Sequence, residues 1–396
     1  MTITADQSKT SVSQPAAGGP VVFISAAEQS ADLHAAKLIR AVHRVDPTVR
    51  FVGVAGEQMR AAGCAGIFDM TAHAAMLAGM FRVAPQAWRM LRTARAYLRA
   101  NPVDLALVID SPMLHLPIAK HARRAGVPVL YYIAPQVWAW AKSRVRRVRR
   151  RTSRLAVILP FEEQFFRDYG IPADYVGHPL FDTLANRQID AEAVAGLRRK
   201  GSPLVVIMPG SRTHVAHEVF PGQLEVAAAI HAAHPGAHFC ISVANARTRP
   251  IVESALADAS IPYSLHEEEN GPLLTAADFA LVASGTATLE TAYYHVPMVV
   301  MYNATRWGWY VFGKWVTCTP HFSIVNILAG RAIVPEFMPF YRSTEPIKRA
   351  ALEMLEPQRL AEKRCELEQM MTPLIKTGAS DNAARIVLEM LAAIRR

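Results

Sequence analysis

The chain repeats one sequence unit, in which a short apolar run is followed by a turn of small polar residues and then by helical spacing. Its clearest copy is the run Phe279–Ala283, which ends in the turn 284–288 before helical spacing resumes at Leu289. An apolar run of this length predicts a buried strand, and the turn after it presents unpaired backbone N–H groups at a helix N-terminus. Because these groups carry the positive end of the helix dipole, a phosphate or diphosphate is favoured there. Ordinary capping of the helix explains the same residues, so this stretch alone leaves both interpretations open.

Strand-like runs occur along both halves of the chain. We predict strands at 21–25, 51–54, 105–109, 129–133, 155–159 and 172–176 in the first half, and at 204–208, 237–243, 277–283 and 298–302 in the second. Strands that alternate with helices are typical of doubly wound parallel sheets. A chain of 396 residues exceeds what one hydrophobic core usually organises. We therefore expect an α/β protein with two Rossmann-like domains, over residues 21–185 and 186–375, and a final helical segment over 376–396. The polar residues 1–20 predict a disordered tail.

The formal net charge of +10 predicts an anionic partner without specifying which one. Seven arginines lie between positions 144 and 154, and a second stretch, 76–95, mixes large apolar residues with arginines. Both stretches suit helices at an anionic lipid surface. Simpler explanations also fit, namely a solvated basic face for the first and a core helix with outward arginines for the second. We expect no nucleic-acid partner, because no recognised binding motif accompanies the arginines.

Compartment and metal content follow from what the sequence lacks. No apolar run reaches the length of a membrane-spanning helix, and the first 20 residues lack the pattern of a secretory leader. The four cysteines are far apart and have no metal-ligand spacing. We therefore expect a cytoplasmic protein without a metal site.

Two predicted strand ends carry residues suited to chemistry. The strand 105–109 is followed by Asp110, and open α/β sheets bind their ligands at the carboxyl ends of the strands. A carboxylate placed there is a candidate general base, although aspartate is also a common turn and capping residue. In the second half, the strand 204–208 is followed by Gly210, Ser211 and Arg212, and an arginine suits a phosphate group.

Five motifs add a resemblance to this pattern. They are Tyr-Tyr-Ile-Ala-Pro-Gln-Val-Trp-Ala-Trp at 131–140, Leu-Pro-Phe-Glu at 159–162, Val-Gly-His-Pro-Leu at 176–180, Pro-Gly-Ser-Arg at 209–212 and Ser-Gly-Thr-Ala-Thr-Leu-Glu at 284–290. In their order and spacing, the chain resembles the lipid-A-disaccharide synthase family from residue 21 to its C-terminus.

The resemblance implies a fold and a reaction. The fold is the GT-B glycosyltransferase architecture of two Rossmann-like domains, with the C-terminal helix packing back on the first domain and with homodimers. The reaction is the inverting transfer of 2,3-diacylglucosamine from its UDP donor to 2,3-diacylglucosamine 1-phosphate, which forms a β-1,6 linkage and releases UDP. The resemblance places this reaction at the cytoplasmic face of the inner membrane, with no metal and no other cofactor.

Together with the strand-end residues, the resemblance assigns roles to individual positions. Asp110 is the predicted general base, and His115 is its main rival because imidazole titrates near neutrality. The predicted UDP-binding residues are Ser211, Arg212, Ser284, Gly285, Thr286, Ala287, Thr288, Glu290 and Asn326. The predicted acceptor-binding or domain-junction residues are Glu28, Ser30, Asp32, His115, Trp138 and His178.

Several loops depart from the family pattern, mostly in the first domain. The first loop usually reads Gly-Glu-x-Ser-Gly-Asp, but Ala27 and Ala31 replace its glycines here. After Pro112 the chain reads Met-Leu-His where Asp-Phe-Asn is usual. Two alternatives therefore stay open: a related UDP-sugar enzyme of the UDP-N-acetylglucosamine epimerase type, and a catalytically silent paralogue that binds UDP-sugar or lipid.

Overall fold

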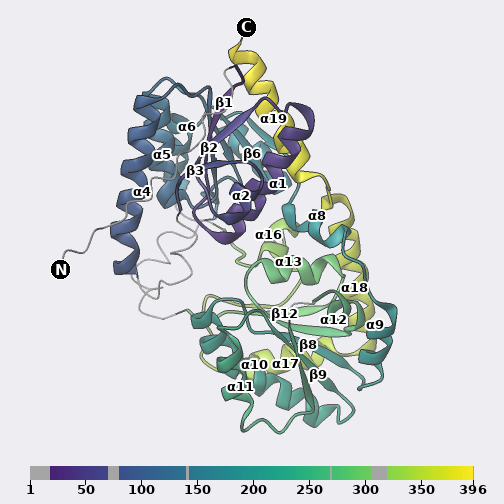
Figure 1. The fold of residues 1–396 in the computed structure, drawn as a ribbon. Coiled ribbons are helices and arrows are strands. Elements are labelled where there is room, and N and C mark those ends of the chain that lie inside the picture. The colour runs from purple at the N-terminus through teal and green to yellow at the C-terminus, as the bar shows by residue number, and fades with distance from the viewer. Residues whose placement is uncertain (1–17, 70–79, 140–141, 268–269, 305–318, 396) are drawn as a thin grey trace, which may run out of the picture. The chain divides into compact units, whose positions relative to one another are not determined.

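The computed structural model describes residues 18–69, 80–139, 142–267, 270–304 and 319–395, which form two compact units (Figure 1). Unit 1 comprises the chain up to Val137 together with Ser143–Pro179 and Gly378–Arg396. Unit 2 comprises Trp138–Lys142 and Leu180–Thr377. The predicted tail lies outside the described residues, except for positions 18–20.

Unit 1 is built on a seven-stranded parallel sheet with the order β3-β2-β1-β4-β5-β6-β7. Its strands are β1 (Val21–Ser25), β2 (Arg50–Val54), β3 (Ala65–Phe68), β4 (Leu105–Ile109), β5 (Val129–Tyr132), β6 (Arg154–Val157) and β7 (Ala173–Tyr175). All residues of β4 and β5 are buried, as expected for central strands that helices cover on both faces. The helices are α1 (Gln29–Val45), α2 (Glu57–Ala61), α4 (Met80–Ala100), α5 (Pro112–Arg124), α6 (Val145–Arg151) and α7 (Pro160–Asp168), and a 3-10 turn, Lys142–Arg144, precedes α6.

The last helix, α19 (Ala379–Ile394), returns to unit 1 and packs on α1 (Figure 1). Asn382 Nδ2 donates to the carbonyl oxygen of Val176 at 2.9 Å. Arg154 forms an ion pair with Glu389 at 2.8 Å. One side of α19 is apolar and buried, so this helix is part of the core of unit 1. The predicted return of the C-terminal helix is confirmed.

Unit 2 is built on a six-stranded parallel sheet with the order β10-β9-β8-β11-β12-β13. Its strands are β8 (Leu204–Met208), β9 (His238–Val243), β10 (Tyr263–Glu267), β11 (Phe279–Ala283), β12 (Met298–Met301) and β13 (Glu336–Phe337). The helices are α8 (Pro179–Ala185), α9 (Ala191–Arg198), α10 (Thr213–Ala233), α11 (Arg249–Leu256), α12 (Asn270–Ala276), α13 (Thr286–Tyr293), α16 (Ile324–Ala329), α17 (Glu345–Met354) and α18 (Pro357–Met371), with a 3-10 turn at Thr372–Leu374.

Each face of the unit 2 sheet has its own apolar core. Alternate residues of a strand point to opposite faces, so Val205 and Ile207 join one buried cluster while Val206 and Met208 join the other. Two doubly wound parallel sheets are therefore present, which confirms the predicted fold class. No described helix is long and apolar enough to cross a membrane.

Candidate active site

The carboxyl ends of two neighbouring strands of unit 1 carry residues in the left-handed backbone region. Asp110 and Ser111, which follow β4, have φ angles of 54° and 40°, and Ile133, which follows β5, has a φ of 55°. Because β4 pairs with β5 in parallel, these residues lie at the same edge of the sheet. A left-handed conformation costs a non-glycine residue about 1–2 kcal/mol, and such residues cluster at functional sites. The edge that carries the predicted base is therefore also a strained one.

The backbone of Asp110 is held by three hydrogen bonds. Its N–H donates to the carbonyl oxygen of Tyr132 at 3.2 Å. Its carbonyl oxygen accepts from the Tyr131 hydroxyl at 2.6 Å and contacts His115 Nδ1 at 2.8 Å. The next residue, Ser111, donates its hydroxyl to Glu28 Oε1 at 3.0 Å, which joins the loops after β4 and β1. The half-buried carboxylate of Asp110 thus lies on a fixed loop, beside an exposed pair of polar side chains.

His115 lies beneath this loop and not at its surface. The side chain is fully buried, and burial lowers the pKa of His115 to about 4. Its second ring nitrogen, Nε2, lies 3.0 Å from the hydroxyl of Ser25 on β1. Both ring nitrogens therefore contact protein atoms. A base must reach its substrate, so this buried position disfavours His115 as the alternative general base.

Asp32, a predicted acceptor-binding or domain-junction residue, makes hydrogen bonds within the fold of unit 1. Its carboxylate accepts the backbone N–H groups of Gly56 and Gln58 at 2.9 Å each and that of Met59 at 3.2 Å. These groups belong to the first turn of α2, whose unpaired N–H groups need acceptors. Asp32 is buried and caps α2, whereas Glu28 and Ser30 are exposed near the start of α1.

The two remaining candidates of this group lie elsewhere. His178 follows β7 in unit 1, and its pKa is lowered to about 4 by burial and by the neighbouring His34. Trp138 is buried and belongs to the short segment of unit 2 that interrupts unit 1 in the sequence.

In unit 2, the two predicted phosphate turns share one edge of the sheet. β8 and β11 pair in parallel, so the turns that follow Met208 and Ala283 are neighbours. Gly210 has a φ of 106°, and a Cβ there would lie only 2.9 Å from Val215 Cγ1. Arg212 is exposed at the N-cap position of α10, where its guanidinium can reach an anion.

The second turn leaves space above the N-terminus of α13. Gly285 has a φ of 154°, and a Cβ there would meet no atom within 4 Å. Gly285 and Thr286 are exposed, whereas the buried Thr288 donates its hydroxyl to the Gly285 carbonyl at 2.8 Å and closes the turn. Ser284 uses its N–H in a bond to the Met301 carbonyl at 3.0 Å. The first N–H groups of the helix remain the donors that this turn offers to a phosphate.

Glu290 lies one turn inside α13 and already holds two donors. Its carboxylate accepts from Arg187 Nη1 at 3.0 Å and from Asn270 Nδ2 at 3.1 Å. Asn270 in turn accepts the hydroxyl of Ser242 at 2.7 Å. Sequence analysis does not identify Arg187, which is 103 residues away and in no motif, or Asn270. A carboxylate has about four acceptor positions, and these two bonds occupy two of them.

Asn326 has its amide fully engaged within unit 2. Its two Nδ2 hydrogens go to the Val334 carbonyl at 2.9 Å and to Glu336 Oε2 at 3.0 Å. Its Oδ1 accepts the backbone N–H groups of Ile333 at 2.8 Å and Val334 at 3.0 Å. These four bonds use the hydrogen-bonding capacity of the side chain, so Asn326 shapes the loop before β13 instead of offering free groups.

Two parallel doubly wound units, each with its candidate loops at the carboxyl edge of its sheet, define the GT-B class of glycosyltransferase fold. Solved structures with this fold cover nearly the whole chain. A UDP co-structure of MnaA from S. aureus has a TM-score of 0.64 at 11% identity, over 96% of this chain and 98% of that one. MurG from Acinetobacter baumannii has a TM-score of 0.55 at 14% identity, over 93% and 99%.

The sequence comparison is more specific. A family model described as lipid-A-disaccharide synthetase matches residues 22–390. The lipid-A-disaccharide synthase of Geobacter metallireducens is 35% identical over 93% of this chain and 97% of the relative. That of Solibacter usitatus is 36% identical over 94% and 98%. The chain belongs to the lipid-A-disaccharide synthetase family, and it is a glycosyltransferase.

Proposed function

We propose that the protein joins 2,3-diacylglucosamine, taken from its UDP donor, to 2,3-diacylglucosamine 1-phosphate through a β-1,6 bond. The observation that carries this proposal is the family match, which spans residues 22–390 and includes both the Asp110 loop and the Ser284 turn. The epimerase alternative has structures of similar fold at 14% identity in its favour, including a putative UDP-N-acetylglucosamine 2-epimerase from Listeria monocytogenes, and a likeness at this identity shows the fold alone.

The proposed chemistry divides between the two sheet edges. The acceptor's primary hydroxyl oxygen attacks the anomeric carbon of the donor sugar, and its proton passes to the Asp110 carboxylate. The bond from the anomeric carbon to the phosphate oxygen breaks, so UDP leaves with the electron pair and the configuration inverts. Arg212 and the N–H groups at the start of α13 stabilise the charge that grows on the diphosphate, and Glu290 holds the ribose. None of these steps uses a metal or another cofactor.

The test is an incubation of the purified protein with UDP-2,3-diacylglucosamine and 2,3-diacylglucosamine 1-phosphate, with disaccharide and UDP followed by mass spectrometry. Asp110→Asn keeps the shape of the side chain and removes the base, so turnover should fall about 10² to 10⁴-fold. Asp168→Asn, at an exposed position at the end of α7, is the matched control and should keep full turnover. A wild-type protein that binds UDP but makes no disaccharide would support the silent-paralogue alternative.

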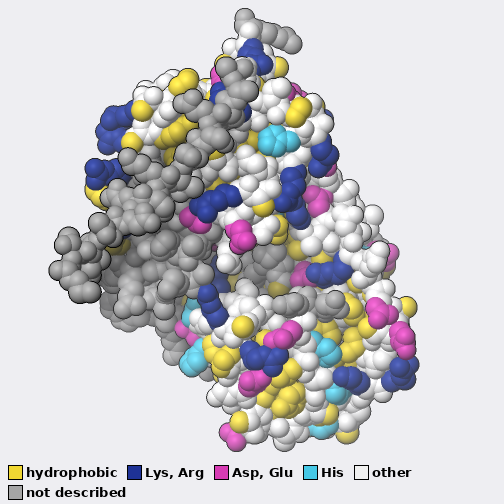
Figure 2. All heavy atoms as spheres, viewed as in Figure 1, with side chains coloured by type: hydrophobic (Ala, Val, Ile, Leu, Met, Phe, Trp, Pro, Cys, Tyr) yellow, Lys and Arg dark blue, Asp and Glu magenta, His cyan; other side chains and the backbone are white. Residues whose placement is uncertain are grey.

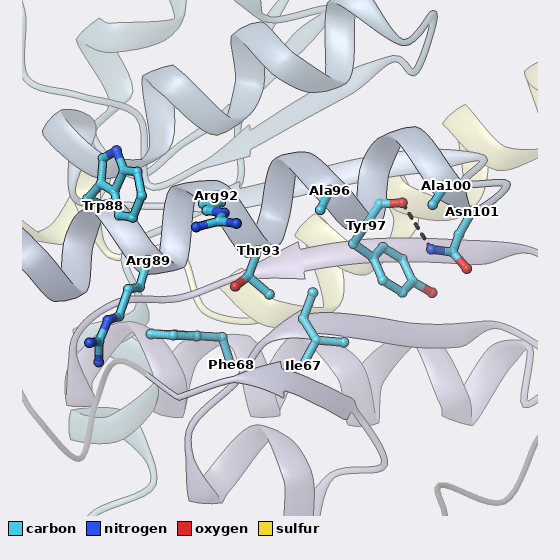
Figure 3. A pocket seen from close by; sticks show the side chains of 10 residues that line it. All are labelled: Ile67, Phe68, Trp88, Arg89, Arg92, Thr93, Ala96, Tyr97, Ala100 and Asn101. Atoms are coloured by element: carbon cyan, nitrogen blue, oxygen red, sulfur yellow. Dashed lines mark hydrogen bonds between the residues drawn. The ribbon is translucent and has the colours of Figure 1, made fainter.

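We also propose that the reaction takes place at the anionic cytoplasmic face of the inner membrane, where α4 contacts lipid. Trp88 on α4 is 61% exposed, and the Arg92 guanidinium lies 5.5 Å from the centre of its ring. Both line an open groove of about 780 Å³ between α4 and β3, together with Phe68 and Arg89 (Figure 3). α4 contains no acidic residue, and basic side chains lie over the region of α4 and α5 (Figure 2). An exposed tryptophan among arginines suits the interface of an anionic membrane.

Of the stretch 76–95 that the sequence singles out, residues 76–79 lie outside the described part of the chain. The homodimer is proposed from the family resemblance alone.

A further inference from the structure

A buried polar group lies directly beneath the Asp110 loop. It consists of Ser25 at the end of β1, His115 on α5 and Tyr131 on β5, and each of these residues is 0% exposed. Ser25 Oγ lies 3.0 Å from His115 Nε2, and His115 Nδ1 lies 2.8 Å from the Asp110 carbonyl oxygen. The Tyr131 hydroxyl donates to the same carbonyl at 2.6 Å. Two buried side chains, from α5 and β5, therefore contact one peptide oxygen, and Ser25 on β1 contacts the histidine from its other side.

The chemistry of the carbonyl decides the direction of each bond. A carbonyl oxygen only accepts, so His115 Nδ1 carries its proton and Nε2 accepts the hydroxyl hydrogen of Ser25. Burial favours this neutral imidazole, because it lowers the pKa of His115 to about 4. Burial likewise raises the pKa of Tyr131 well above its ordinary value, and the nearby Asp110 carboxylate adds to this effect, so the phenol keeps the proton that it donates.

We propose that His115 and Tyr131 are positioning residues, which hold the Asp110 peptide by its carbonyl and thereby fix the direction of the catalytic carboxylate. The φ angles of Asp110 and Ser111, 54° and 40°, belong to a backbone region that persists only where surrounding contacts enforce it. The two buried donors provide these contacts, and the bond between Ser25 and His115 links the loop after β4 to β1. The proposal rests on the function proposed above, since it assigns these residues a role through the base.

His115 stands where the family usually has asparagine, and this difference supplies a conservative variant. The amide N–H of an asparagine occupies nearly the place of histidine Nδ1–H, so His115→Asn keeps the donor to Asp110. His115→Leu keeps apolar bulk but removes the donor, and Tyr131→Phe removes a single hydroxyl. Loss of either donor should lower kcat about 10-fold, which corresponds to about 1.4 kcal/mol of transition-state stabilisation, with KM for the UDP donor unchanged. His115→Asn should restore most of kcat.

The decisive measurement combines these variants with Asp110→Asn. A positioning residue acts only through the base, so His115→Leu and Tyr131→Phe should have no further effect on the residual turnover of Asp110→Asn. If they lower that residual turnover as much as they lower wild-type turnover, or if the single variants keep wild-type kcat, the proposal is wrong. Unchanged UDP affinity in every variant shows that unit 2 remains folded.

A second measurement does not depend on the reaction. Hydrogen exchange of the amides at 110–115, read by mass spectrometry, should become faster in His115→Leu and Tyr131→Phe and return towards the wild-type rate in His115→Asn. If the wild-type protein shows no turnover, the proposed function is contradicted. The exchange pattern would still support the inference that His115 and Tyr131 stabilise the conformation of the Asp110 loop. Equal exchange in all variants would show that the two donors do not hold it.

Discussion

Acid should destabilise unit 1 through His115, and the structure gives the size of the effect. Burial lowers the pKa of this imidazole from its ordinary 6.5 to about 4, so between these values the unfolded chain binds a proton that the folded unit does not. The contribution of this neutral imidazole to the stability of unit 1 is therefore fully present above pH 6.5 and is lost as the pH falls towards 4. At about 1.4 kcal/mol per pKa unit, the loss is about 2 kcal/mol at pH 5 and about 3 kcal/mol below pH 4.

His115→Asn isolates this effect, because it removes the titration and keeps the donor to Asp110. Urea unfolding at pH 8 and pH 5 should show that the wild type loses about 2 kcal/mol more than the variant between the two values. Carboxylates and other histidines titrate in both proteins, so they cancel in this difference. Hydrogen exchange in α5 assigns the unfolding transition to unit 1, since two units need not unfold together.

His217→Asn provides the control for the chemical change, because His217 is exposed in unit 2. It should leave the stability difference of unit 1 between pH 8 and pH 5 as large as in the wild type. If His115→Asn loses as much stability as the wild type between these values, the imidazole is not held neutral by burial, and the proton directions assigned around Asp110 are wrong.

Three further predictions concern the ligands. Arg212→Ala should weaken UDP binding about 10 to 100-fold by calorimetry, because a charge-assisted bond to phosphate contributes about 1.5–3 kcal/mol. The control is Arg359→Ala, at an exposed position on α18. If Arg212→Ala and the wild type bind UDP equally well, Arg212 does not belong to the site. Glu290→Gln should also weaken UDP binding, because its amide N–H₂ would face the donors of Arg187 and Asn270; unchanged affinity would exclude a ribose contact. Trp88→Ala should reduce sedimentation with anionic vesicles and leave the salt dependence of the remaining binding intact, and binding that ignores lipid charge would contradict the membrane proposal.

The central strands could be predicted from the sequence, and the strands at the sheet edges mostly could not. β4, β8 and β11 are continuous apolar runs because helices bury both of their faces. The sequence analysis misses β3, β10 and β13, and each of them lies at the edge of a sheet. Edge strands are partly exposed, so they lack the apolar run that identifies a buried strand.

The positions of the candidate site residues could be predicted better than their contacts. Asp110 and Gly285 follow apolar strands, so their place at a carboxyl edge follows from the parallel fold. Asp32 looks like part of the same loop but turns inward to cap α2, whose N–H groups lie 24 to 27 residues further along. The sequence around Asp32 does not show whether its carboxylate points inward or outward. Its orientation depends on the N–H groups of α2, which are distant in the sequence.

The two sheet edges meet different requirements of the proposed reaction, a positioned base in unit 1 and hydrogen-bond donors for a diphosphate in unit 2. A base must point its carboxylate at one hydroxyl, and unit 1 fixes the Asp110 peptide with two buried donors on a strained loop. A leaving diphosphate instead needs donors that are already turned towards it, and unit 2 presents these through a turn whose Gly285 leaves the space above it open. The unit 1 edge should therefore be sensitive to substitutions beneath its loop, where the donors are. The unit 2 edge should be sensitive to any side chain added above its turn.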